Sequence, residues 1–256
     1  MTRKERLIFL NKELLSERPD ARRFVLPESE SDLFRLFRSL VNVREAAPVS
    51  DEFLAVQDEF LKTEAKNKGI VDISQMAEAR PDIYLWQGDI TRLKVGAIVN
   101  AANSGMTGCY YPCHGCIDNV IHTYAGVQLR IECDEIMRAQ GFTEPTGKAK
   151  ITDSYNLPCE KVIHTVGPIV SGRLAEEHCQ LLKSCYLSCL ELADNAELSS
   201  IAFCCISTGE FHFPNEAAAH IAIDTVTRYK EETGSSIKVI FNVFKDVDLE
   251  IYKGLL

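Results

Sequence analysis

The stretch GDITRLKVGAIVNAANSGMTGCYYPCHGCIDNVIHTYAG, residues 88–126, decides which fold this chain can adopt. It holds a short β-branched run at residues 97–100, followed by a loop rich in small and amide side chains. Three cysteines and a histidine come next, and an apolar pattern at helical spacing begins near Asp118. A strand that passes through a polar loop into a helix is the unit of α/β folds, whose ligands bind where strands end. The stretch therefore predicts both an α/β fold and the place of its site.

The same order of elements continues from residue 81 to the end of the chain. Short β-branched or aromatic runs alternate there with longer helical patterns, which predicts a mostly parallel sheet with helices on both faces. The predicted strands are residues 83–87, 97–100, 161–166, 200–206 and 237–244, and the predicted helices are 117–138, 174–194 and 216–232.

The first 75 residues carry helical patterns and no convincing strand. Ser29 and Ser50 each precede an apolar-periodic run and are typical helix N-caps, and Gly69 is a typical stop. The predicted helices have apolar faces, which need a partner to pack against. We therefore expect residues 1–77 to form a helical extension that packs on a main domain of residues 78–256, in preference to an independent module.

The charge and composition exclude several classes of protein. The net charge of −9 argues against a nucleic-acid partner, because Lys and Arg are interleaved with acids and form no basic patch. No apolar run approaches the roughly 20 residues of a membrane helix, and the charged N-terminus leads into no signal-like core. We expect a cytoplasmic protein whose ten cysteines form no disulfides, since most of them lie in apolar periodic segments.

The pattern C-x3-C-H-x-C at residues 109–116 has the spacing of metal ligands. Zn²⁺ binds Cys and His, and a catalytic site keeps three protein ligands and an open position. Neighbouring side chains in an extended segment point apart, so Cys113 and His114 cannot easily share one ion. We therefore predict a zinc site of Cys109, His114 and Cys116. A four-ligand structural zinc and unliganded cysteines remain alternatives.

A loop with a glycine between small hydroxyl residues follows the predicted strand 200–206. Such a loop allows successive backbone N–H groups to point into one concavity, which suits a diphosphate. On its own the indication is weak, because many loops between strands and helices contain glycine. The loop residues are Ser207, Thr208, Gly209, Glu210 and Phe211.

Four further polar residues stand at predicted strand ends or at a helix start. Asp89 could accept hydrogen bonds from an amino group or could simply form a turn. Asn100 and Asn103 could orient a hydroxyl or a water, or close the loop between them. Asp118 lies four residues before His122, on the same helix face, and could position a water beside a metal or only interact with the helix dipole.

Taken together, these motifs resemble the macrodomain family, whose members bind ADP-ribose. The matching segments are residues 88–91, 97–104, 118, 121–122, 125–126, 162–168 and 207–209, in the family's order. The resemblance implies a three-layer sandwich with a mixed, mostly parallel sheet. The usual glycine run before the loop Asp is replaced by residues 109–116, which is similar to the zinc-dependent macrodomains of bacteria and fungi. Those proteins also carry an N-terminal helical extension and remove ADP-ribose from proteins.

The resemblance also implies roles for individual residues. Asp89 and Ile90 would bind adenine, with Phe244 a weaker candidate for stacking on it. Asn103 and Asp118 would meet the distal ribose together with the zinc and act in catalysis. The remaining residues implied to contact ADP-ribose are Cys116, Ile117, Ser207, Thr208, Gly209, Glu210 and Phe211.

The leading hypothesis is a zinc-dependent hydrolase that removes mono-ADP-ribose from Asp or Glu side chains of proteins. The resemblance further implies that it reverses modification by a sirtuin-type ADP-ribosyltransferase, with a lipoyl-carrier protein as a substrate. Two other hypotheses stay open. One is a module that reads ADP-ribose without cleaving it, and the other is a deacetylase of O-acetyl-ADP-ribose.

Overall fold

A computed structural model describes residues 1–19 and 24–256 and centres on a seven-stranded sheet. The strand order is β2-β3-β9-β8-β5-β7-β6. The five inner strands run parallel, and β2 and β6 pair antiparallel at the two edges. The strands are β2 (Glu78–Arg80), β3 (Ile83–Gln87), β5 (Ala97–Ala102), β6 (Ala149–Asp153), β7 (Lys161–Val166), β8 (Ser200–Phe203) and β9 (Lys238–Val243). The predicted α/β fold with a mixed, mostly parallel sheet is confirmed.

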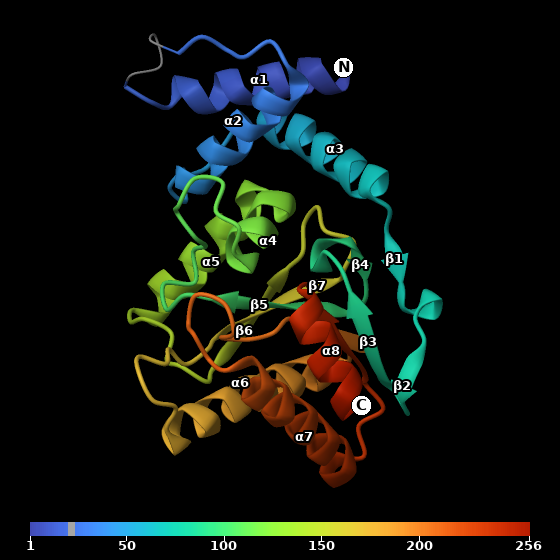
Figure 1. Ribbon diagram of the computed structural model, residues 1–256. Coiled ribbons are helices and arrows are strands. Elements are labelled where there is room, and N and C mark those ends of the chain that lie inside the picture. The colour runs from blue at the N-terminus through green and yellow to red at the C-terminus, as the bar shows by residue number, and fades with distance from the viewer. Residues whose placement is uncertain (20–23) are drawn as a thin grey trace.

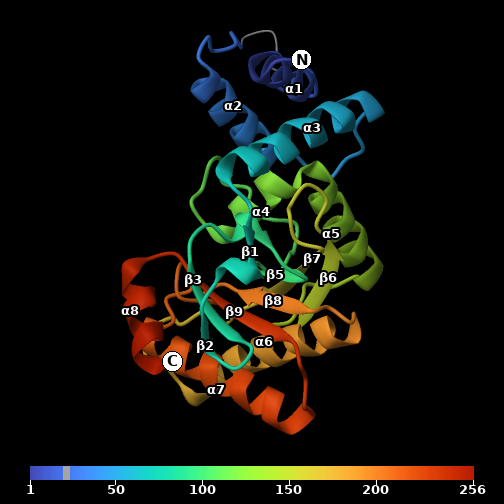
Figure 2. The same ribbon diagram turned by 90° about the vertical axis from the view of Figure 1, so that its right-hand side faces the viewer.

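Helices cover both faces of this sheet, and a third group of helices lies above one of them (Figures 1 and 2). On one face lie α6 (Glu176–Asn195), α7 (Asn215–Thr233) and α8 (Asp246–Leu255). On the other lie α4 (Ile117–Ala125) and α5 (Val127–Gln140). The three N-terminal helices, α1 (Arg3–Ser16), α2 (Glu30–Val43) and α3 (Asp51–Lys68), pack beyond α4.

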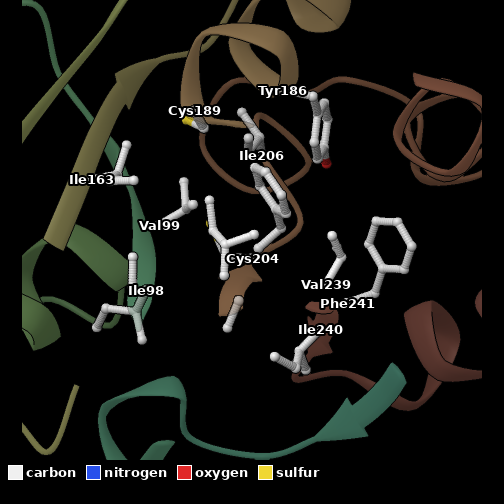
Figure 3. Packing of buried hydrophobic residues seen from close by; sticks show 14 of the residues in the cluster. Ile98, Val99, Ile163, Tyr186, Cys189, Cys204, Ile206, Val239, Ile240 and Phe241 are labelled. Atoms are coloured by element: carbon white, nitrogen blue, oxygen red, sulfur yellow. The ribbon is translucent and has the colours of Figure 1, made fainter. Parts of the chain in front are cut away.

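The inner strands hold the main core because they are apolar on both faces, as strands sandwiched between helices must be. Figure 3 shows Ile98, Val99 and Ile163 of two neighbouring strands packed in the same core as Tyr186 and Cys189 of α6. All five of these side chains are fully buried. This packing fixes the sheet and therefore the relative positions of its strand ends.

Several element boundaries differ from the predicted ones. The strand predicted at 200–206 ends at Phe203, and the one predicted at 97–100 continues to Ala102. The edge strands β2 and β6 and the helix α8 were not predicted. The N-terminal region also contains one short strand, β1 (Val71–Asp72), which pairs with β4 (Leu93–Lys94) in a separate two-stranded sheet.

The single helix predicted over residues 117–138 is wrong, because the chain breaks at Gly126 between α4 and α5. Gly126 has φ +99°, a conformation that favours glycine. A Cβ at this position would lie 2.7 Å from Nε2 of Gln57 in α3 and 2.7 Å from Oε1 of Gln128. The break thus lets α3 approach the backbone of the main domain closely.

The N-terminal helices begin and end at the residues that the sequence indicates. Ser29 and Ser50 are the N-caps of α2 and α3, and their hydroxyls accept hydrogen bonds from the backbone N–H of the third helical residue. The core of these helices includes Phe37 and Phe60 and extends to Val127 of α5. They therefore pack on the main domain, and the division of the chain at residue 77 remains our proposal. None of the described helices has the length and hydropathy needed to cross a bilayer.

Candidate functional site

The carboxyl ends of the parallel strands bring most of the predicted site residues to one edge of the sheet. Asp89 follows β3, Asn103 follows β5 and Phe244 follows β9. The loop of residues 207–211, called here the phosphate loop, follows β8. Because neighbouring parallel strands end at the same edge, these segments line one region although they are far apart in sequence.

Asp118 sits at the start of α4, beneath this edge, and is only 4 % exposed. Its Oδ1 accepts a hydrogen bond from Nδ2 of Asn100 at 2.8 Å, and its Oδ2 accepts one from Nδ2 of Asn103 at 3.3 Å. Nε2 of His122 lies 3.6 Å from Oδ1. Burial raises the pKa of Asp118 to about 6, although the hydrogen bond from Asn100 opposes the shift. Two strand-end amides thus hold one buried carboxylate in a fixed orientation.

Behind Asp118 a chain of buried polar side chains leads away from the site. The second hydrogen of Asn100 Nδ2 points to Nδ1 of His164 at 3.1 Å, and Nε2 of His164 lies 2.9 Å from Oγ1 of Thr152. Since Nδ1 accepts from an amide, Nε2 carries the ring hydrogen and donates to the hydroxyl. Burial lowers the pKa of His164 to about 3, so the ring is neutral. The sequence analysis missed His164, although a polar residue inside a continuous apolar strand is a signal that could have found it.

The three predicted zinc ligands converge. The Sγ atoms of Cys109 and Cys116 and a ring nitrogen of His114 all lie within 4.8 Å of one another, and the three residues are half-buried. Bonds of about 2.0–2.3 Å to a tetrahedral zinc would place such atoms about 3.5 Å apart, so small side-chain rotations suffice. Cys113 turns away, and its Sγ donates to the carbonyl of Arg35 at 3.4 Å. The donor set fits Zn²⁺.

Burial, together with the nearby Cys109 and Asp118, raises the pKa of the Cys116 thiol to about 12, although the backbone of Asn119 opposes the shift. A metal must therefore displace the thiol proton when it binds, as is general for cysteine ligands.

A second group of metal-binding residues, His122, Cys133 and His164, is buried deeper in the same domain. Both ring nitrogens of His164 are already engaged by Asn100 and Thr152. Burial lowers the pKa of His122, and the neighbouring His164 and the positive charge of Arg130 lower it further. His164 thus belongs to a neutral hydrogen-bonded chain, whereas the ring nitrogens of His122 have no hydrogen-bond partner among the described residues. The positive charge of Arg130 beside His122 disfavours a cation at this group.

The phosphate loop presents unused backbone donors. No hydrogen bond formed within residues 1–19 and 24–256 uses the N–H groups of Gly209, Glu210 or Phe211. A Cβ built on Gly209 meets no atom within 4 Å, so the space beside the loop is open. Ser207 has φ +66°, and its buried Oγ has no partner among the described residues. The hydroxyl of Thr208 is less available to donate to a ligand, because it already donates to the carbonyl of Cys205.

The phosphate loop and the loop of residues 107–116, called here the cysteine loop, lie side by side. Oε1 of the exposed Glu210 is 3.8 Å from Nε2 of His114. Ile117 directly follows the predicted zinc ligand Cys116 at the start of α4, close to Asp118. A ligand that contacts the phosphate loop can therefore reach the Cys/His group and the buried carboxylate.

Asp89 lies farther along the same edge. Its Oδ1 accepts from the backbone and hydroxyl of Thr91 at 3.0 and 2.6 Å, and Nζ of Lys68 donates to its Oδ2 at 3.0 Å. Burial favours a higher pKa, but these hydrogen bonds and the ammonium charge outweigh it and hold the pKa of Asp89 below its usual value. Lys68, which the sequence analysis missed, comes from the end of α3 and also lies 3.4 Å from the ring centroid of Tyr124.

The two predicted adenine neighbours differ in exposure. Ile90 is buried directly after Asp89, whereas Phe244 is 74 % exposed at the end of β9. An exposed aromatic ring at a strand end is free to stack on a planar ligand.

Comparison with known proteins agrees with this geometry. The family model of the Macro domain matches residues 99–222. A protein of Treponema medium named "Protein-ADP-ribose hydrolase" is 52 % identical over 260 residues, which cover 100 % of each chain. The chain belongs to the macrodomain family. A protein of the same name from Staphylococcus aureus (strain MRSA252) is 52 % identical to this macrodomain over 98 % of its chain and 94 % of the relative.

Among solved structures, this macrodomain is similar to that of Trypanosoma brucei in complex with ADP-ribose. The TM-score is 0.66 with 29 % identity, over 85 % of this chain and 94 % of the other. The macrodomain fold predicted from the sequence motifs is thereby confirmed.

Proposed function

We propose that this macrodomain binds ADP-ribose and hydrolyses the bond between its anomeric carbon and an Asp or Glu side chain of a protein. The observation that carries the proposal is the position of Asp118. It is a buried carboxylate held by Asn100 and Asn103, and the cysteine loop that precedes it adjoins the phosphate loop. The full-length relatives named "Protein-ADP-ribose hydrolase" support the same activity.

Binding and chemistry fall to different residues. The free N–H groups of the phosphate loop would bind the diphosphate, because backbone donors in a concavity favour anions. Asp89 and Ile90 would bind the adenine, and Phe244 would stack on it. Asn103 and Asp118 would meet the distal ribose.

In the reaction, the bond from the anomeric carbon to the carboxylate oxygen breaks, and a water oxygen takes its place. Asp118 would orient that water through the lone pairs that Asn100 and Asn103 leave free. The departing carboxylate carries away the bonding electron pair, and the proton that the attacking water loses is released to solvent. Positive character develops at the anomeric carbon in the transition state, and the negative charge of Asp118 stabilises it.

Cys109, His114 and Cys116 would hold Zn²⁺ beside this position. When bound there, the ion would act as a Lewis acid toward the substrate. We include zinc dependence in the proposal because two thiols and one imidazole leave a coordination position open.

The resemblance to zinc-dependent macrodomains extends the proposal to its context. The enzyme would act in the cytoplasm and reverse modification by a sirtuin-type ADP-ribosyltransferase. A lipoyl-carrier protein that bears mono-ADP-ribose is the substrate that we would test first.

The test measures single-turnover hydrolysis and calorimetric affinity on the same preparations. Asp118→Ala should lose hydrolysis of an ADP-ribosyl-carboxylate ester by roughly tenfold to a hundredfold, about 1.4–2.8 kcal/mol of barrier, and keep most of its affinity for free ADP-ribose. Glu210→Gln removes an exposed negative charge near His114 on the phosphate loop. It therefore tests whether loss of any negative charge in this region lowers the rate of hydrolysis as Asp118→Ala does.

Three outcomes would contradict the proposal in different ways. A wild-type protein that binds ADP-ribose but never releases it from protein is a reader. One that cleaves only a free acetyl ester is an O-acetyl-ADP-ribose deacetylase. Equal rates for wild type and Asp118→Ala would remove the carboxylate from the reaction.

A further inference from the structure

The cysteine loop, residues 107–116, carries the three metal-binding side chains but has no helix or strand of its own. Backbone groups in such a segment are normally held by regular structure or by water. Here, side chains from outside the loop hold six of its backbone groups: the carbonyls of Thr107, Gly108, Cys109, Tyr111 and His114 and the N–H of Cys113.

Arg38 of α2 makes one of these contacts directly and supports two others. Its Nη2 donates to the carbonyl of His114 at 2.5 Å and to Oδ1 of Asn119 at 2.9 Å. Asn119 in turn donates from Nδ2 to the carbonyls of Tyr111 at 2.9 Å and Cys109 at 3.4 Å. By engaging Oδ1, the guanidinium fixes the orientation of the buried Asn119 amide, so that Nδ2 faces the loop.

Asn42, one turn later on α2, is fully buried and holds the opposite side of the loop. Its Oδ1 accepts the N–H of Cys113 at 2.9 Å, and its Nδ2 donates to Oγ1 of Thr123 at 3.0 Å. Cys113 has φ +55°, an unusual conformation for a residue other than glycine. The contact from Asn42 stabilises this turn, which directs Cys113 away from the group formed by its neighbours.

Arg130 of α5 fastens the start of the loop to the end of α2. Its Nε donates to the carbonyl of Thr107 at 2.7 Å, and its Nη1 donates to the carbonyl of Val41 at 2.8 Å. Its guanidinium also lies 4.3 Å from the ring centroid of Tyr110. The loop is thus held between the main domain and a helix that lies about 80 residues earlier in the sequence.

We propose that α2 is a part of the catalytic site, in which Arg38 and Asn42 are positioning residues that hold Cys109, His114 and Cys116 in reach of one ion. The proposal rests on the proposed zinc site. It assigns a task to α2 beyond packing against the main domain.

The test compares Arg38→Met with Arg35→Met in the full-length protein. Arg35 is an exposed residue one turn earlier on the same helix, so its substitution controls for lost charge and helix propensity. Zinc affinity is measured by competition with a chromophoric chelator, and amide hydrogen exchange of residues 107–116 is measured on the metal-free protein.

Arg38→Met should bind Zn²⁺ about 10–100-fold more weakly, the range seen when partners of metal ligands are removed. Exchange of the loop amides should become faster, while the urea midpoint of the metal-free protein changes little. Arg35→Met should match the wild type in all three measurements. Arg38→Lys replaces the guanidinium with a single ammonium group and should recover part of the zinc affinity. Asn42→Ala provides a second variant on the other side of the loop.

The outcomes separate this proposal from the proposed function. If Arg38→Met and Asn42→Ala bind zinc as tightly as the wild type and exchange at its rate, α2 positions nothing and the zinc-dependent hydrolase stands. If the wild type binds no zinc, both the zinc site and this proposal are wrong.

Discussion

The neutral His164 makes the stability of this protein depend on pH in a way that one substitution should remove. Its pKa is about 3 in the folded protein, below the value of about 6.5 in an unfolded chain. Between these values the unfolded chain binds a proton that the folded chain does not. The resulting stability is fully present above about pH 6.5 and is lost as the pH falls toward 3.

The size of the effect follows from the two pKa values. Each pH unit inside the window costs up to about 1.4 kcal/mol, and acidification from pH 7 to pH 5 costs about 2 kcal/mol from this residue alone. Glutamine at position 164 is uncharged at every pH, and its amide can accept from Asn100 and donate to Thr152 as the imidazole does. His164→Gln should therefore keep the hydrogen-bonded chain but lose this pH dependence.

Urea unfolding of metal-free protein at pH 7, 6 and 5 measures the effect. The difference in unfolding free energy between wild type and His164→Gln should change by about 2 kcal/mol over this range, in favour of the variant at low pH. Asp118, whose raised pKa acts in the opposite direction, is present in both proteins and cancels in the comparison. The pKa of His122 is lowered mainly by burial, which both proteins share, and only the smaller contribution of His164 to that shift is lost in the variant.

His220→Gln provides the matched control, because this histidine is exposed on α7 and its substitution should leave the pH dependence of the wild type unchanged. Parallel curves for wild type and His164→Gln would refute the reasoning, since they would mean that His164 is not held neutral.

The remaining predictions concern the ligand and the metal. Gly209→Val should weaken ADP-ribose binding at least about tenfold, the cost of roughly one hydrogen bond to a charged group, because the added side chain enters the space beside the free N–H groups. Stability should change little, since a Cβ at this position meets no protein atom within 4 Å. Unchanged calorimetric affinity would place the diphosphate elsewhere. Ser207→Ala should weaken the binding of ADP-ribose by no more than one hydrogen bond, about 0.5–1.5 kcal/mol, since the Oγ of Ser207 has no partner among the residues described. Metal analysis of protein purified without added zinc should find about one zinc per chain, and a Cys109→Ser, His114→Ala double variant that remained fully loaded would rule out this site.

The inner strands could be predicted because burial on both faces demands a continuous apolar run, and β7 fits its prediction at both ends. The edge strands could not. Glu78–Arg80 is exposed and charged, and Ala149–Asp153 is only partly buried, so neither shows a clear strand pattern. The break at Gly126 also escaped prediction, because an isolated glycine is tolerated inside a helical pattern and the approach of Gln57 from a distant helix shows only in the fold.

The reactive residues of the site could be predicted from the sequence more readily than the residues that hold them in place. Asp118 and the Cys/His spacing stand out because their residue types are poor core material. Their partners do not stand out. Arg38 reaches Asn119 over 81 residues of sequence, and Lys68 reaches Asp89 over 21, and no local pattern indicates contacts that only the finished fold creates.

The position of β9 in the sheet affects how the protein folds during synthesis. This strand, Lys238–Val243, lies between β3 and β8, and β3 ends about 150 residues earlier. At about 5–20 residues per second, β9 is made roughly 10–30 s after β3. Until then the sheet exists as two separate parts, β2-β3 and β8-β5-β7-β6, each with an open edge that can pair with other chains. Asp89 and the phosphate loop belong to different parts, so a nascent chain without β9 cannot yet bring together the two segments that we propose bind ADP-ribose.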